Sequence, residues 1–164
     1  MMTLGPGARA PEFSMVDLDS EEHRLGTLLR RGPVVLAIGK SSCATCDLAF
    51  PCFQRLYEAY SRERWGLIAL LQDTPSAARH FARRLGLTFP VAAESAPYPV
   101  SRDYDPEGTP SIHLIDAEGR IADASTGFGK AALNRLSAEL ARLVGEPPVE
   151  VAPAGDGKPS FRPG

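Results

Sequence analysis

Cysteine is scarce in this sequence, with three residues among 164. So few cysteines, and an odd number of them, exclude the disulfide framework that stabilises many small secreted proteins. Two of the three, Cys43 and Cys46, nevertheless lie close together. In a chain without a disulfide framework, such a pair is more typical of redox chemistry or metal binding than of a structural bridge.

Long apolar runs and a strong net charge are also missing. No segment approaches the roughly 20 apolar residues of a membrane span. A net charge of −2 does not favour nucleic acids or membrane surfaces as partners. The sequence starts with MMTLGPGARAPEF, which lacks the apolar core of a signal peptide. We therefore expect a cytoplasmic protein that has no membrane span and binds no nucleic acid.

What is present is an alternation of strand-like and helix-like segments in a chain long enough for one sizeable core. Apolar runs predict buried strands at Pro33–Gly39 and Trp65–Asp73. Helices are predicted from about Ala44 to Arg62, over Thr74–Gly86 and over Lys130–Val144. The segments PSIHLID and RIADAST flank an AEG turn and predict an antiparallel hairpin. This order predicts an α/β fold whose first central strands are parallel.

The composition changes near residue 146. The last segment, EPPVEVAPAGDGKPSFRPG, is rich in proline and glycine and poor in large apolar residues. Such a segment cannot bury enough apolar surface to fold by itself. We therefore predict one domain over residues 1–145 and a tail over residues 146–164, which is flexible unless it docks on the domain.

The cysteine pair is predicted where a buried strand meets a helix. Residues three apart share a helical face, so the sulfurs of Cys43 and Cys46 can form a disulfide with little backbone movement. The helix N-terminus stabilises a thiolate at Cys43, and Lys40 adds positive charge nearby. Cys46 lies one turn further in and should be more buried. The pattern predicts a two-step exchange, in which Cys43 attacks a substrate disulfide and Cys46 then displaces the product.

Two other uses of the pair remain open. A zinc site needs four ligands, and Cys52 with three histidines offers no suitable spacing, so no metal is predicted. The pair could also be two inert core cysteines, although its position at a strand-to-helix junction favours redox activity. Cys52 itself is predicted to be a small buried core residue, with a sensor thiol as the alternative. For His113 we expect a hydrogen-bonded structural histidine rather than a proton shuttle.

Four motifs resemble those of one family. They are the entry segment GARAPEFSMVDLDSEEHRLGTLL with its APxF, the segment VVLAIGKSSCATC, Pro51 five residues after Cys46, and the segment EGTPSIHLIDAEGRI. From about Gly7 to Val144 the chain resembles the thioredoxin-fold redoxins of the AhpC/TSA-redoxin superfamily, and most closely their TlpA-like thiol:disulfide oxidoreductases. The resemblance implies a thioredoxin-like three-layer sandwich with a central mixed sheet flanked by helices and an N-terminal strand extension.

The resemblance also implies a substrate-binding region. Pro110 matches a cis proline that packs beside the redox pair, where the backbone of Thr109 can pair with a substrate chain as a short added strand. Phe128, in the loop STGFGK, is a candidate for lining the substrate groove, with ordinary packing as the alternative.

The sequence departs from the family pattern at several positions. Ser42 stands where tryptophan is usual before the first cysteine, and Ala37 stands where a buried acid or asparagine often accepts a proton. The proton acceptor for the second cysteine is therefore unassigned. Glu107 and Asp47 are the nearest acids in the sequence, and we expect both to be solvated surface acids.

The leading interpretation is a thiol:disulfide oxidoreductase that acts on disulfides of proteins or small molecules. It needs no bound cofactor because the sulfurs carry the chemistry, and its electrons would come from thioredoxin or a reductase. A thiol peroxidase is the alternative, although the PxxxTxxC loop of peroxiredoxins fits neither cysteine in register. A non-catalytic redoxin fold that binds a partner is the third interpretation.

Overall fold

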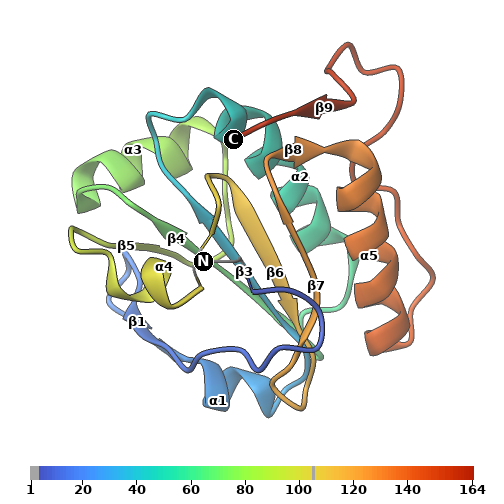
Figure 1. Cartoon of the computed structure of the whole chain (residues 1–164), viewed down its shortest axis with the longest axis horizontal. Coiled ribbons are helices and arrows are strands. Elements are labelled where there is room, and N and C mark those ends of the chain that lie inside the picture. The colour runs from blue at the N-terminus through green and yellow to red at the C-terminus, as the bar shows by residue number, and fades with distance from the viewer. Residues whose placement is uncertain (1–3, 105) are drawn as a thin grey trace.

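The computed structural model describes residues 4–104 and 106–164, which are built around a five-stranded sheet (Figure 1). The strand order is β5-β4-β3-β6-β7. Strands β3, β4 and β5 are parallel, whereas β6 is antiparallel to both β3 and β7. The predicted mixed sheet and its closing hairpin are confirmed. The strands are β3 (Val34–Gly39), β4 (Gly66–Leu71), β5 (Val91–Ala93), β6 (Ser111–Ile115) and β7 (Ile121–Thr126).

Five helices and two small strand pairs complete the described structure. The antiparallel pair β1–β2 forms the N-terminal extension, and β8 pairs with β9 near the C-terminal end. The helices are α1 (Leu25–Leu29), α2 (Ala44–Ala59), α3 (Pro75–Arg84), α4 (Pro99–Tyr104) and α5 (Lys130–Val144), and the small strands are β1 (Ser14–Val16), β2 (Glu22–Arg24), β8 (Phe128–Gly129) and β9 (Phe161–Arg162).

The two faces of the sheet pack into two separate cores, because successive side chains of a strand point to opposite faces. On β3, Val35 and Ala37 pack with α2, α3 and α5. The alternate residues of the same strand, Leu36 and Ile38, pack with α1 and residues from α4 and the N-terminal segment. Covering both faces explains why the central strands read as continuous apolar runs rather than as alternating patterns.

Local sequence signals account for the start of α3 but not for the end of α2. The side chain of Thr74 accepts a hydrogen bond from the Ala77 amide at 3.2 Å, and so begins α3 where the sequence predicts. Helix α2, by contrast, ends at Ala59, three residues before the predicted Arg62. Tyr60 is already extended there, and its buried hydroxyl bonds to Ser137 on α5. The helix therefore ends at this tertiary contact, although the apolar periodicity of the sequence continues beyond it.

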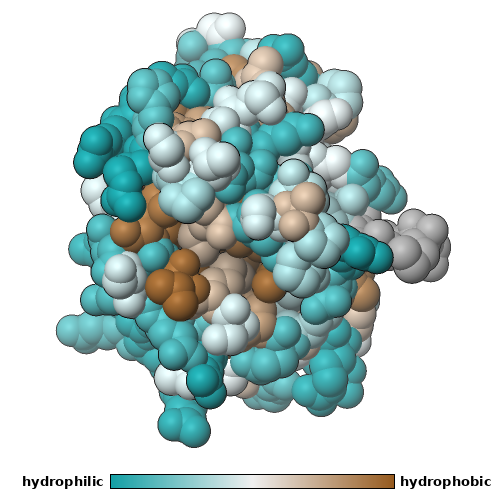
Figure 2. Space-filling view, turned by 90° about the vertical axis from the view of Figure 1, so that its left-hand side faces the viewer, coloured by the Kyte–Doolittle hydropathy of each residue, from teal (hydrophilic) through white to brown (hydrophobic). Residues whose placement is uncertain are grey.

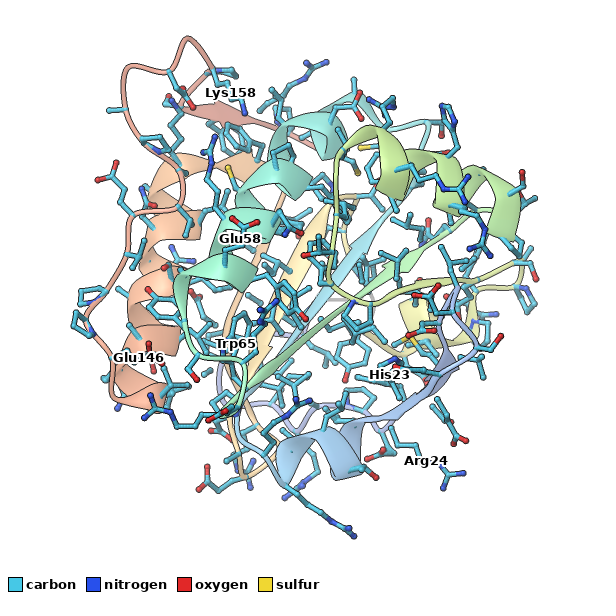
Figure 3. The ribbon with its side chains drawn as sticks, turned by 180° about the vertical axis from the view of Figure 1, so that it is seen from behind. His23, Arg24, Glu58, Trp65, Glu146 and Lys158 are labelled. Carbon is cyan, nitrogen blue, oxygen red and sulfur yellow. The ribbon has the colours of Figure 1, made fainter. Side chains whose placement is uncertain are left out.

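The predicted tail docks along α2 and α5 over much of its length. Figure 3 shows its start at Glu146, near the loop before β4, and Lys158 near its far end. Glu146 pairs with Arg64 at 3.1 Å, and the Asn134 side chain of α5 accepts the amides of Val151 and Ala152, both at 2.9 Å. The composition of the tail predicted flexibility because composition alone cannot reveal the residues of the domain on which the tail docks. The division into residues 1–145 and 146–164 stays a prediction.

The surface is mainly polar. Figure 2 shows one face on which hydrophilic residues surround a limited hydrophobic area. The exposed large hydrophobic residues of the described chain are Val16, Val149 and Phe161, which come from three separate segments. Among the described helices, none has both the length and the apolar character that a membrane crossing requires.

Candidate active site

The redox pair lies at the N-terminus of α2. Cys43 is the residue that caps the helix, with an extended backbone (φ −99°, ψ 112°), and its Sγ accepts the Cys46 amide at 3.2 Å. The first amides of any helix lack acceptors within the helix, and the Cys43 sulfur serves as the acceptor for one of them. Cys43 is partly exposed, whereas Cys46 is completely buried, and the two sulfurs are not bridged. The predicted difference in burial is confirmed.

Burial controls the protonation of the second cysteine. Loss of solvent raises the pKa of the Cys46 thiol well above its usual range, and the hydrogen bond with Cys43 raises it further. Cys46 therefore carries its proton at neutral pH. The sulfur that reaches solvent is that of Cys43, and a thiolate there has both the helix N-terminus and the Cys46 amide to stabilise it.

A loop distant in sequence completes the pair's surroundings. Strand β6 runs beside β3 with Ser111 opposite Ile38, which places the residues before β6 next to the start of α2. The Thr109–Pro110 bond is cis, as the resemblance implied. The thiol of Cys43 donates to the Thr109 carbonyl at 3.3 Å. The structure therefore joins the cysteine pair and the proline loop, although they are 66 residues apart.

The strand-to-helix loop has a support that the sequence analysis missed. The Asp73 carboxylate accepts the Ser41 amide with one oxygen and the Ser41 hydroxyl with the other, both at 2.7 Å. Asp73 follows β4, which is parallel to β3, so the carboxyl ends of both strands meet at this edge. An acid directly after the neighbouring parallel strand was the signal that could have identified it.

Replacing Asp73 with alanine should loosen the loop that carries Cys43. Two hydrogen bonds to a charged acceptor are lost, so we expect the free energy of unfolding to fall by about 2 kcal/mol. Urea unfolding followed by circular dichroism measures this loss. The Asp73→Asn variant should be destabilised less than Asp73→Ala, because its amide oxygen can still accept one of the two hydrogen bonds. The control is Asp19→Ala, which removes an exposed carboxylate. Equal stability of the Asp73 and Asp19 variants would show that the loop does not depend on this carboxylate.

The other predicted support residues contribute little through their side chains. The Lys40 side chain is exposed, and its backbone carbonyl accepts the Cys43 amide at 3.3 Å. Ser42 and Glu107 are exposed and make no side-chain hydrogen bond to a described residue. Asp47 is also exposed and pairs with Arg84 at 2.8 Å. Glu107 and Asp47 are thus surface acids, as expected.

Three other residues had specific predictions. The Phe128 side chain is completely buried in the core, so its predicted role in lining the groove is wrong, and the packing alternative is confirmed. Cys52 is buried as predicted, and burial raises the pKa of its thiol. His113 is also buried, but neither ring nitrogen has a hydrogen-bond partner among the described residues. The expectation of a hydrogen-bonded histidine is therefore wrong, because its face of the sheet is apolar.

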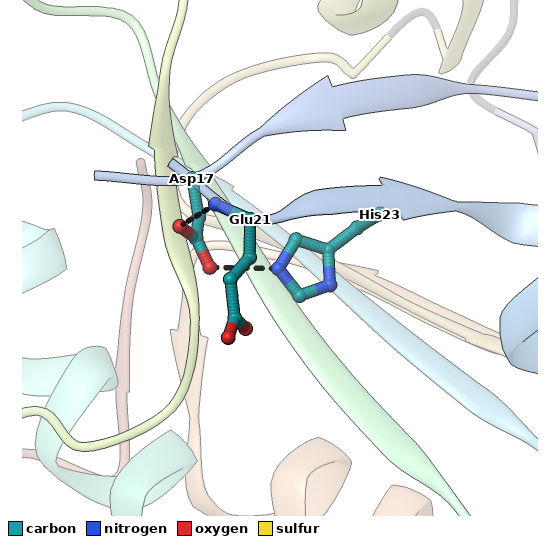
Figure 4. A group of neighbouring side chains, drawn as sticks. All are labelled: Asp17, Glu21 and His23. Atoms are coloured by element: carbon teal, nitrogen blue, oxygen red, sulfur yellow. Dashed lines mark hydrogen bonds and ion pairs between the residues drawn. The ribbon is translucent and has the colours of Figure 1, made fainter. Parts of the chain in front are cut away.

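Among the described residues, one group of potential metal ligands lies together on the β1–β2 hairpin, formed by Asp17, Glu21 and His23 (Figure 4). Asp17 accepts the amides of Asp19 and Glu21 and contacts the His23 ring at 2.7 Å. Burial opposes the charge on Asp17, but these hydrogen bonds outweigh it and lower its pKa. The carboxylate thus already has structural partners that fix the hairpin turn.

Comparisons with known proteins agree with this geometry. The model of the AhpC/TSA family matches residues 6–124. Thiol-disulfide oxidoreductase ResA of Geobacillus kaustophilus is 31% identical over 122 residues, which cover 74% of this chain and 69% of that protein. ResA of Bacillus subtilis is 25% identical over 126 residues, which cover 76% of this chain and 69% of that protein.

Solved structures extend the comparison to the fold. The thioredoxin domain of a thiol-disulfide oxidoreductase from Bacteroides vulgatus superposes with a TM-score of 0.73 at 18% identity, over 84% of this chain and 99% of that one. The predicted thioredoxin-like fold is confirmed. Because the family model matches most of the chain and a relative is 31% identical over 74% of it, the chain belongs to the AhpC/TSA family.

Proposed function

We propose that Cys43 and Cys46 carry the thiol:disulfide exchange of this oxidoreductase, and that the enzyme is of the TlpA-like type. The observation that supports the proposal most strongly is the position of Cys43. Its partly exposed sulfur caps α2, accepts the Cys46 amide and lies 3.3 Å from the Thr109 carbonyl. The Cys46 amide and the helix N-terminus can hold this sulfur as a thiolate once its proton has left the Thr109 carbonyl, and its exposure makes it accessible to a substrate.

The exchange proceeds in two steps. The Cys43 thiolate attacks one sulfur of a substrate disulfide, whose S–S bond breaks, and the other substrate sulfur leaves as a thiolate. Cys46 then loses its proton and attacks the Cys43 sulfur. The Cys43–Cys46 disulfide forms, the second substrate sulfur leaves as a thiolate, and the proton that Cys46 lost goes to the thiolate released in the first step. The substrate gains two electrons and the enzyme loses two.

Deprotonation of Cys46 controls the second step. Burial keeps this thiol protonated, and no carboxylate among the described residues hydrogen-bonds to it. Its amide and sulfur already lie beside Cys43, so the attack requires little movement once the proton has left. The substrate thiolate that is released in the first step is the base that the exchange itself supplies for the Cys46 proton.

Substrate would dock on the proline loop. The Thr109 backbone lies next to the Cys43 sulfur and can pair with an extended segment that flanks a substrate disulfide. Disulfide-containing proteins or peptides are therefore the substrates, and thioredoxin or a reductase returns the enzyme to the dithiol. We place the reaction in the cytoplasm, a proposal that rests on the low cysteine content and the absence of a disulfide framework.

The proposal is tested by two reactions of the fully reduced protein. One mixes it with a peptide disulfide and the other with hydrogen peroxide, and mass spectrometry follows the oxidation of Cys43. We expect the peptide disulfide to react at least about tenfold faster, because the site is arranged for thiol exchange. A faster reaction with peroxide would support the thiol peroxidase instead. The Cys43→Ser variant is the control and should be inert to both oxidants.

A further inference from the structure

The end of the tail lies across the redox site. Figure 1 shows β9 and the C-terminal end beside the start of α2. Residues 160–164, here named the strap, contact three elements of the domain. Strand β9 pairs with β8, the Ser160 carbonyl accepts the Lys130 amide at 2.9 Å, and the Pro163 carbonyl accepts the Thr45 hydroxyl at 2.8 Å. The last of these contacts is made to the first turn of α2, next to Cys46.

Gly164 lies against the backbone of the proline loop. A Cβ atom added to Gly164 would lie 2.2 Å from the Thr109 carbonyl oxygen and 3.3 Å from the Thr109 nitrogen. The same carbonyl oxygen accepts the thiol of Cys43. The strap therefore occupies the space beside Thr109 where an extended substrate segment would have to lie. Only a residue without a side chain fits there.

The strap is held by its backbone and not by a core. All five of its residues are exposed, including the Phe161 side chain at 62%. The tail before it is fixed by the ion pair between Asp156 and Lys130 at 2.5 Å and by the contacts with α5. This attachment keeps the strap at a high local concentration near the site. A segment held in this way can leave without disrupting the hydrophobic core.

We propose that the strap is an internal occupant of the polypeptide-docking groove, and that it competes with extended substrates for Thr109. The inference rests on the proposed function, because it concerns the groove that serves the Cys43–Cys46 exchange. A small disulfide reaches the exposed side of the Cys43 sulfur while the strap is docked. A polypeptide disulfide needs the Thr109 backbone and reacts only after the strap has left.

The Gly164→Ala variant tests this competition. Its added methyl group cannot fit beside the Thr109 backbone, so the end of the strap must leave. We expect the rate of reaction with a peptide disulfide to rise about three- to tenfold, which corresponds to the net loss of about one hydrogen bond. The rate with oxidised glutathione, a small disulfide, should stay within about twofold. Hydrogen exchange at the Lys130 amide should accelerate, because Ser160 is its acceptor.

Two further variants make the test decisive. Gly5→Ala is the matched control, since its added Cβ would meet nothing within 4 Å. The double variant Gly164→Ala, Asp156→Asn also removes the ion pair with Lys130 and frees more of the tail. Equal rates with the peptide disulfide in the wild-type protein, the single variant and the double variant would overturn this inference but leave the proposed function intact. If no protein exchanged with either disulfide while iodoacetamide still alkylated Cys43, the proposed function would fail, and the inference with it.

Discussion

Replacing Cys46 with serine should turn the protein into a trap for its substrates. Cys43 remains at the start of α2 and still attacks a disulfide, but the variant lacks the sulfur that displaces the product. The mixed disulfide should therefore accumulate, and multiple turnover should be abolished. Replacing Cys43 should also abolish turnover but trap nothing, because the buried Cys46 thiol keeps its proton and does not reach solvent.

The measurement is capture from a cell lysate, followed by non-reducing electrophoresis and mass spectrometry of the bands that reducing agent releases. Cys52→Ser is the control. Cys52 is buried and lies six residues after Cys46 on α2, so its replacement should leave the exchange reaction unchanged. Equal capture by the Cys43 and Cys46 variants would contradict the assignment of the attacking sulfur. The absence of any mixed disulfide with Cys46→Ser would remove the main support for the exchange mechanism.

His113 should make the protein sensitive to mild acid. Burial lowers the pKa of His113 from 6.5 to about 4, and no described residue offers its ring a hydrogen bond. As the pH falls through 6.5, the unfolded chain takes up the proton first, so the free energy of unfolding decreases. The loss continues to about pH 4 and amounts to about 3 kcal/mol, since each unit of pKa difference corresponds to 1.36 kcal/mol.

The His113→Phe variant should remove this part of the pH dependence. Phenylalanine keeps a ring beside Tyr104, which lies 5.2 Å from the imidazole centre, and it cannot take up a proton. Urea unfolding of both proteins between pH 4 and pH 8 gives a difference curve from which the other titrating groups cancel. His80→Gln removes an exposed imidazole and should follow the wild-type curve. A constant difference between the variant and the wild-type protein would show that His113 does not cause the acid sensitivity.

Local patterns predicted the secondary structure well where they coincide with packing. The apolar run at β3 and the cap at Thr74 gave elements that the structure confirms. The end of α2 was misplaced because Tyr60 continues the apolar periodicity but bonds to α5 from an extended backbone. Phe128 was misassigned for a related reason: two flanking glycines indicate a loop, whereas the side chain fills the core.

The sequence by itself determined where the two sulfurs lie relative to each other, because a spacing of three residues at a helix start fixes their separation through local geometry alone. The resemblance, not the spacing, supplied the cis bond before Pro110. Only the tertiary structure decided which groups surround the pair. Asp73 reaches Ser41 through the pairing of β3 with β4, and Gly164 reaches Thr109 because the tail follows α2 and α5 back to the site. Such contacts join residues far apart in the chain, and they depend on how the layers pack rather than on any short pattern of residues.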